Sequence, residues 1–148
     1  MTQMRLYSLF GIKIACIQDL QLMELARRTF PKKYINGLLK CIERDAPMTA
    51  SEKMVWKSTK EKGLKLFAPE HGGSYEVFNA RPLPEEIVLY CVQDVQFLPK
   101  LWLCYHAKLT WKWTKRLEMA TKHRIESSQS PSFNGKGQHM TLAPSGWR

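Results

Sequence analysis

The scarcity of strand-forming segments limits the fold of this chain more than any other feature. Residues 12–17 form one short apolar run, rich in β-branched side chains, that has the composition of a buried strand. Residues 65–67 and 75–77 alternate around Pro69, Gly72 and Gly73, so residues 65–78 also have the pattern of a hairpin. A single strand leaves its edges unpaired. The sequence therefore predicts either a nearly all-helical domain with one hairpin or an α/β domain whose other strands are absent from this chain.

Most of the remaining sequence has helical patterning. Asp19 can cap a helix that begins at Leu20, and Thr49 or Ser51 can cap another. Pro99 should kink or interrupt the longest apolar helix, because its ring clashes with the carbonyl four residues before it. The expected helices are residues 20–28, 34–44, 49–62, 84–105 and 110–124.

Length and composition fit one globular domain with a polar extension. The chain has 148 residues, of which 44% are hydrophobic and 24% are charged. From residue 126 onward the sequence is dominated by Ser, Gly, Pro and polar residues. We therefore expect a domain over residues 1–125 and a flexible polar tail over residues 126–148. The net charge of +10 favours a polyanionic partner.

Cysteine and histidine spacing argues against a disulfide framework or a zinc site. The four cysteines are far apart, form no Cys-x-x-Cys pair, and lie in apolar runs, as reduced core residues of an intracellular protein do. The histidines have no metal-ligand spacing to them. No run approaches the roughly 20 apolar residues of a membrane span, so no membrane partner is expected. The expected location is the cytoplasm or nucleus, with a mitochondrial presequence as an open alternative.

Tyr90 and Asp94 are the most informative pair in the helix predicted at residues 84–105. Residues four apart lie on one helical face, so a phenol and a carboxylate project side by side. A second stripe, Ile87, Cys91 and Val95, continues to Leu98 and Trp102 and predicts the buried face. Spacing alone leaves two interpretations of Asp94. It is either a helix residue paired with a nearby lysine or capping another element, or it is a hard-metal ligand beside a phenol.

Four segments, in this order and spacing, give the chain a resemblance to a known family. They are Asp19 to Ala26, Tyr34 to Leu38, Phe78 to Leu83 and Tyr90 to Val95. Together they resemble the 3′–5′ exonuclease domain of the DEDD superfamily, in its tyrosine subclass of RNase D-like and Mut-7-like proteins, with fungal members most similar. The resemblance covers roughly residues 6–148. It implies the C-terminal, mostly helical part of an RNase H-like α/β fold.

The resemblance also implies a chemistry. In two-metal hydrolysis of a terminal phosphodiester, two divalent ions clamp the attacking and leaving oxygens. By the match to the family's Tyr-x-x-x-Asp motif, Asp94 would ligate Mg²⁺ or Mn²⁺, and Tyr90 would orient the attacking water. The implied substrate is a single-stranded 3′ end of DNA or RNA.

Two of the family's acidic motifs are missing here. Asp-x-Glu is found nowhere in the sequence, and no acid precedes Leu6, where the second-motif Asp is expected. One carboxylate cannot hold two divalent ions against water. We therefore expect the C-terminal part of a nuclease domain, incomplete or inactive on its own, with apolar surface that a protein partner would cover. The alternative is a non-catalytic nucleic-acid-binding or adaptor module derived from the same fold.

A basic, aromatic helix follows the Tyr-x-x-x-Asp motif. Basic residues bind phosphates through counterion release, and exposed aromatic rings can stack on bases. The opposing interpretation is that Trp111 and Trp113 are core residues and the lysines a solvated face. The residues predicted to contact nucleic acid are Lys108, Trp111, Lys112, Lys115 and Arg116.

Overall fold

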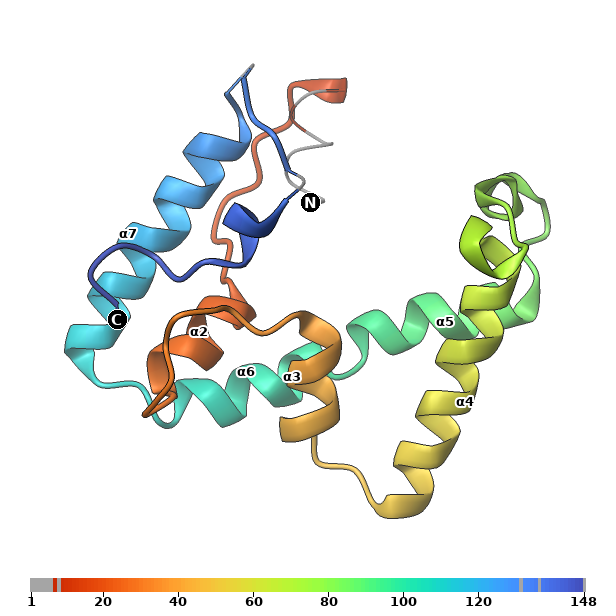
Figure 1. Cartoon of the computed structure of the whole chain (residues 1–148), viewed down its shortest axis with the longest axis horizontal. Coiled ribbons are helices and arrows are strands. Elements are labelled where there is room, and N and C mark those ends of the chain that lie inside the picture. The colour runs from red at the N-terminus through yellow and green to blue at the C-terminus, as the bar shows by residue number, and fades with distance from the viewer. Residues whose placement is uncertain (1–6, 8, 131, 136, 148) are drawn as a thin grey trace. The chain divides into compact units, whose positions relative to one another are not determined.

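The chain forms two compact helical units. A computed structural model describes residue 7 and residues 9–130, 132–135 and 137–147 (Figure 1). Unit 1 combines Met1–Cys41 with Trp102–Arg148, and unit 2 is Ile42–Leu101. Helices α3 (Leu38–Asp45) and α6 (Leu98–His106) run from one unit into the other. The described residues are mostly helical, as the sequence predicts, and within them no strand is formed.

Unit 1 is built on α2 (Leu20–Arg27) and α7 (Trp111–Ser128), which pack together. Asp19 caps α2 as predicted: its carboxylate accepts from the backbone N–H groups of Gln21 and Leu22. The same carboxylate pairs with Arg124 of α7, so the cap also ties the two helices together. The core contains fully buried apolar side chains: Leu22, Met23, Leu25 and Tyr105.

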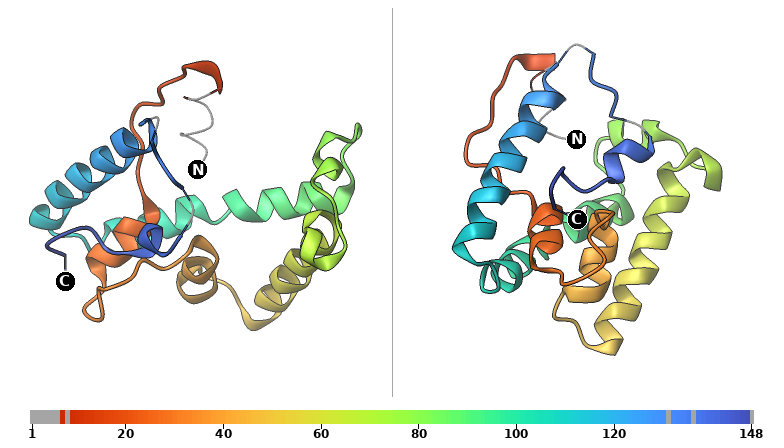
Figure 2. Two further views of the ribbon diagram at one scale, coloured as in Figure 1. Left: turned by 45° about the horizontal axis from the view of Figure 1, so that its top comes forward. Right: turned by 60° about the vertical axis from the view of Figure 1, so that its left-hand side comes forward.

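The polar C-terminal segment is folded back onto unit 1. After α7, a 3₁₀ turn, η3 (Gln138–Thr141), leads into residues that run beside the loop after α2 (Figure 2). Ile35 N–H donates to the Thr141 carbonyl at 2.8 Å, and Ala143 N–H donates to the Lys33 carbonyl at 3.0 Å. Trp147 is only 5% exposed. The flexible polar tail over residues 126–148 stays a prediction, but its composition does not reveal the burial of Trp147.

Unit 2 is centred on α4 (Ala50–Phe67) packed against α5 (Glu85–Val95). A capping box begins α4: Thr49 accepts from the Glu52 N–H, and Glu52 accepts from the Thr49 N–H. The hairpin predicted at residues 65–78 is wrong. The first part of that segment is the end of α4, and the rest forms 3₁₀ turns η1 (Pro69–His71) and η2 (Tyr75–Asn79). Phe67 of α4 packs against Tyr75 and Phe78, so the alternating aromatic residues form a cluster instead of paired strands.

The strand predicted at residues 12–17 is also wrong. These residues have an irregular backbone, and none of the described residues forms a strand beside them. Ile12 and Ile14 are 50% and 40% exposed. Without a neighbouring strand to take up its backbone N–H and carbonyl groups, an apolar β-branched run has no sheet to join.

The long apolar helix is interrupted near Pro99, as predicted. α5 ends at Val95, residues 96–97 form a turn, and α6 begins at Leu98. Proline is tolerated in the first turn of a helix, where its N–H is not needed. By length and composition alone, the combined helical stretch Glu85–His106, 22 residues, could cross a membrane. This differs from the sequence analysis, which identified no run of that length, and the expected absence of a membrane partner stays a prediction.

The buried face of α5 is not the stripe that the sequence predicts. Ile87 is fully buried, but Cys91 is exposed and Val95 is 58% exposed. Within unit 2, α5 packs mainly against α4, so the residues facing α4 are those that become covered. Several apolar side chains of α5 remain exposed: Val88, Leu89, Val92 and Val95. The protein partner expected to cover such a surface stays a prediction.

Candidate nucleic-acid interface and the Tyr90–Asp94 pair

Tyr90 and Asp94 lie on the side of α5 that meets α4. Asp94 forms an ion pair with Lys60 of α4, whose ammonium also lies 3.8 Å from the centroid of the Tyr90 ring. The Lys60 side chain is only 8% exposed, whereas that of Asp94 is 47% exposed. A lysine this deeply buried requires a compensating charge, and Asp94 supplies it. The spacing of Tyr90 and Asp94 left two interpretations of Asp94 open. In the structure, its carboxylate is paired with the Lys60 ammonium.

Tyr90 is held by close packing against α4. Its ring meets Phe67 edge-on, with the centroids 5.0 Å apart, and its side chain lies directly over Gly63. Burial raises the pKa of the Tyr90 phenol, and the negative charges of Asp94 and Cys91 raise it further. The phenol is therefore protonated at neutral pH. The helix pair thus positions Tyr90 and Asp94 beside each other, and Lys60 sits against both.

The donor atoms near this pair do not fit a two-metal centre. Within the ranges that the structure describes, no three His, Cys, Asp or Glu side chains come close enough to hold a metal ion. Mg²⁺ and Mn²⁺ require carboxylate oxygens, and the one carboxylate here is already neutralised by an ammonium group. The assignment of Asp94 as a metal ligand and of Tyr90 as a catalytic residue stays a prediction.

A second arrangement, in unit 1, gathers positive charge around one indole. A cavity of about 430 Å³, here called the Trp113 cleft, lies between the loop after α2 and the beginning of α7. Its lining includes five cationic side chains and, among the described residues, no carboxylate. The cations are Arg27, Arg28, Lys32, Lys108 and Arg116. The aromatic side chains are Phe30, Trp113 and Trp147.

Trp113 is the centre of the cleft. The Lys32 ammonium lies 3.8 Å from the centroid of the indole, and the Arg116 guanidinium lies 5.2 Å from it. The ring of Trp147 meets Trp113 edge-on, with centroids 5.1 Å apart. Phe30, at the rim, is 78% exposed. The cleft therefore offers both cations for an anion and an exposed ring for a flat apolar group.

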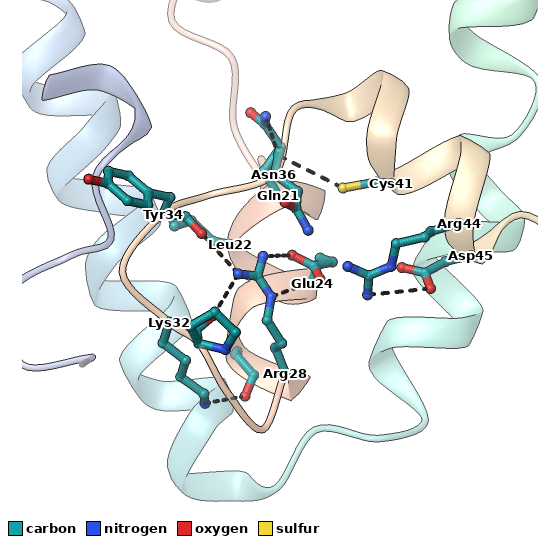
Figure 3. A network of polar contacts seen from close by, with 12 residues as sticks. Gln21, Leu22, Glu24, Arg28, Lys32, Tyr34, Asn36, Cys41, Arg44 and Asp45 are labelled. Atoms are coloured by element: carbon teal, nitrogen blue, oxygen red, sulfur yellow. Dashed lines mark hydrogen bonds and ion pairs between the residues drawn. The ribbon is translucent and has the colours of Figure 1, made fainter. Parts of the chain in front are cut away.

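Arg28 lines one side of the cleft, and its guanidinium is held in place by several polar contacts. Its guanidinium pairs with the fully buried carboxylate of Glu24 and donates to the carbonyls of Pro31 and Tyr34, at 2.8 and 3.0 Å (Figure 3). Lys32 donates to the carbonyl of Ala26 at 3.0 Å. These bonds hold the loop after α2 against the helix and fix where its cations point.

The cations in the cleft repel one another. Burial lowers the pKa of Lys32 below its ordinary value of 10.5, and the charges of Arg28 and Arg116 lower it further. The Lys32 ammonium is therefore placed where its charge is incompletely compensated. An anion bound in the cleft would relieve this repulsion.

The structure brings together two of the five residues predicted to contact nucleic acid. Lys108 and Arg116 line the cleft, but Trp111, Lys112 and Lys115 do not. Trp111 is exposed, with the Lys115 ammonium 5.5 Å from its ring, so this pair lies on an open face of α7. The two tryptophans therefore differ in their surroundings. Trp113 is half-buried among cations, and Trp111 is exposed to solvent.

Sequence reasoning missed Arg27, Arg28 and Lys32. They lie on both sides of Phe30-Pro31, far from α7 in the sequence, and α2 and α7 bring them beside Arg116. The dense run of basic residues around an aromatic residue was the available signal.

No family model, curated protein or solved structure matches this chain.

Proposed function

We propose that this chain is a nucleic-acid-binding module that holds single-stranded DNA or RNA in the Trp113 cleft. The observation that carries the proposal is a cavity lined by five cations, without a described carboxylate, around a half-buried indole. Phosphates bind such cations by releasing counterions, and bases stack on aromatic rings whatever their sequence. The net charge of +10 acts in the same direction by drawing a polyanion to the surface.

A single strand fits these features better than a duplex. Phe30 and Trp111 expose their rings, and a base must be unstacked and unpaired to use them. A module of this kind is the non-catalytic alternative that the resemblance to 3′–5′ exonuclease domains leaves open. It needs no metal of its own.

The proposal is tested by titrating the protein into a fluorescently labelled single-stranded oligonucleotide at several salt concentrations. We expect binding that weakens as salt rises, with a slope in log K against log salt of about −2 to −3, because about 0.7 is contributed per neutralised phosphate and three or four cations take part. Arg28 is not counted, because Glu24 already neutralises it. A fluorescent polyanion without bases should bind more weakly. Absence of binding at low salt would contradict the proposal.

A 3′–5′ exonuclease is the second candidate. It is favoured by the position of Tyr90 and Asp94 on one face of α5, where the charge of Asp94 contributes to the raised pKa of the Tyr90 phenol. Its Mg²⁺ or Mn²⁺ would require carboxylates beyond Asp94, and Asp94 would have to exchange its Lys60 partner. Incubating the same samples with Mn²⁺ tests it: shortening of the strand that is abolished by Asp94→Asn would establish this candidate, and intact strand would favour the module.

Binding should also depend on the protonation of Lys32. An anion in the cleft favours the ammonium, so the pKa of Lys32 in the complex is higher than in the free protein. Affinity for the oligonucleotide should therefore fall as pH rises through the lowered pKa towards 10.5. In Lys32→Arg, whose guanidinium stays charged, affinity should change less over the same range. Equal losses in both proteins would assign the titration to another group.

As pH rises, the free energy of unfolding of the free protein should increase, whereas its affinity for the oligonucleotide falls. Between the lowered pKa in the folded state and 10.5, the unfolded chain binds more protons at Lys32, so the free energy of unfolding rises with pH. The urea midpoint of Lys32→Arg provides the reference, because its side chain does not titrate there. This separates an effect on binding from general loss of structure at high pH.

A further inference from the structure

A second, larger cavity lies beside the Trp113 cleft in unit 1. It has a volume of about 1280 Å³ and is here called the tail cavity. One side is formed by α7 and the other by the residues that follow it, with Asp19 and Gln21 from the beginning of α2. Ligand pockets typically span about 300–1,000 Å³, so this space is large enough for a nucleoside with its surrounding water.

The two cavities share a wall. Arg116, Gly146 and Trp147 line both of them. Trp147 is nearly fully buried and meets Trp113 edge-on, so it separates the indole of the cleft from the tail cavity. A phosphate held by Arg116 would therefore have one neighbouring nucleotide on the side of the tail cavity.

The lining of the tail cavity combines hydrogen-bonding groups with apolar surface. Its polar groups are mostly hydroxyls, amides and imidazoles, including Ser130, Ser132, Asn134 and His139. His139 Nε2 lies 2.9 Å from the Asn134 carbonyl oxygen, which holds the two parts of the tail together. Phe133 and Met140 add apolar area. A base presents the same combination: a flat face and an edge of donors and acceptors.

The charge of the tail cavity also permits a phosphorylated ligand. Asp19 is the one carboxylate among its described lining residues, and it is paired with Arg124. Arg116 lines both the tail cavity and the Trp113 cleft, and no carboxylate is among the described residues that line the cleft. An aliphatic lipid chain would leave the hydroxyl and amide groups desolvated, so the lining is a poor fit to it.

We propose that the tail cavity binds one nucleoside of the same single strand whose phosphate is held at Arg116 in the Trp113 cleft. This inference rests on the proposed function. It assigns a role to the residues after α7: Phe133 contacts the face of the base, and Asn134 contacts its edge. The cleft then supplies the affinity that depends on salt, and the tail cavity adds a contact to a base beyond the stacking in the cleft.

The test compares a labelled single-stranded oligonucleotide with an abasic strand of the same length. The unmodified protein should bind the base-containing strand about tenfold more tightly, since stacking of one base is worth that much. Phe133→Ala and Asn134→Ala should reduce this ratio severalfold while leaving the affinity for the abasic strand unchanged. Ser132→Trp, which adds bulk at an exposed lining position and removes the hydrogen bond between the Ser130 and Ser132 hydroxyls, should do the same.

Lys32→Gln, in the cleft alone, is the matched control: it should weaken binding of both strands equally and keep their ratio. If the unmodified protein binds both strands equally tightly, the inference and the stacking of bases in the cleft are both overturned. The inference alone is overturned, and the proposed function stands, if the cavity variants keep the ratio of the unmodified protein. Binding of neither strand would overturn the inference together with the proposed function.

Discussion

Gly63→Ala should destabilise unit 2 by about 2 kcal/mol net, from an overpacking cost of about 3 kcal/mol, the upper end of the usual range. A Cβ atom at Gly63 would lie 2.4 Å from Cδ2 and 2.7 Å from both Cβ and Cγ of Tyr90. The ring can turn, but Cβ of Tyr90 is fixed to the backbone of α5, so the two helices must separate. The gain in helix propensity from glycine to alanine, about 1 kcal/mol, offsets only part of this cost.

Hydrogen exchange measures this effect locally. Protection of the amides in α4 and α5 should fall by about 30-fold, which corresponds to about 2 kcal/mol. Gly37→Ala is the control, because a Cβ there meets nothing within 4 Å. A Gly63→Ala protein with the protection of the unmodified chain would mean that α4 and α5 do not approach this closely. In that case Lys60 would not be held between Tyr90 and Asp94.

Reversing two charges in the Trp113 cleft should abolish most nucleic-acid binding. In Lys32→Glu/Arg116→Glu, two cations beside Trp113 become anions, and two phosphate contacts turn into repulsions. We expect affinity for a single-stranded oligonucleotide to fall at least about 100-fold at low salt and the salt slope to become shallower by about 1.4. Circular dichroism verifies that the variant retains its helices.

The matched control changes the same net charge elsewhere. Lys62→Glu/Lys65→Glu alters two exposed lysines of α4 and should reduce affinity only a fewfold through the overall charge. Equal losses in the two double variants would show that the cleft has no special role. Lys32→Gln/Arg116→Gln, with an intermediate loss, would separate the missing attraction from the added repulsion.

The helices could be predicted from sequence because their signals are local. The Asp19 cap, the Thr49–Glu52 capping box and the break before Pro99 each depend on neighbouring residues, and each is present. Strand formation depends on distant partners, so the composition of residues 12–17 was insufficient. The aromatic residues around Phe67 show the same limit: alternation predicted strands, and packing made a cluster.

The site could be predicted only in part for the same reason. The Tyr90–Asp94 spacing correctly places both side chains on one face, but spacing cannot reveal that Lys60 lies opposite them. The positive charge on α7 was evident, yet the cleft needs Arg27, Arg28 and Lys32 from the other part of unit 1. The burial of Trp147 beside Trp113 had no local signal in a segment rich in serine and glycine.

The discontinuity of unit 1 has a consequence for synthesis on the ribosome. Unit 2 is a continuous segment, so α4 and α5 can associate as soon as both have emerged. Helix α2 is made early but has its partner in α7, which is translated only after all of unit 2. During that interval the apolar face of α2, with Leu22 and Leu25, stays uncovered and open to chaperones. Slowing translation within unit 2 should therefore lower the yield of native protein more than slowing it after α7.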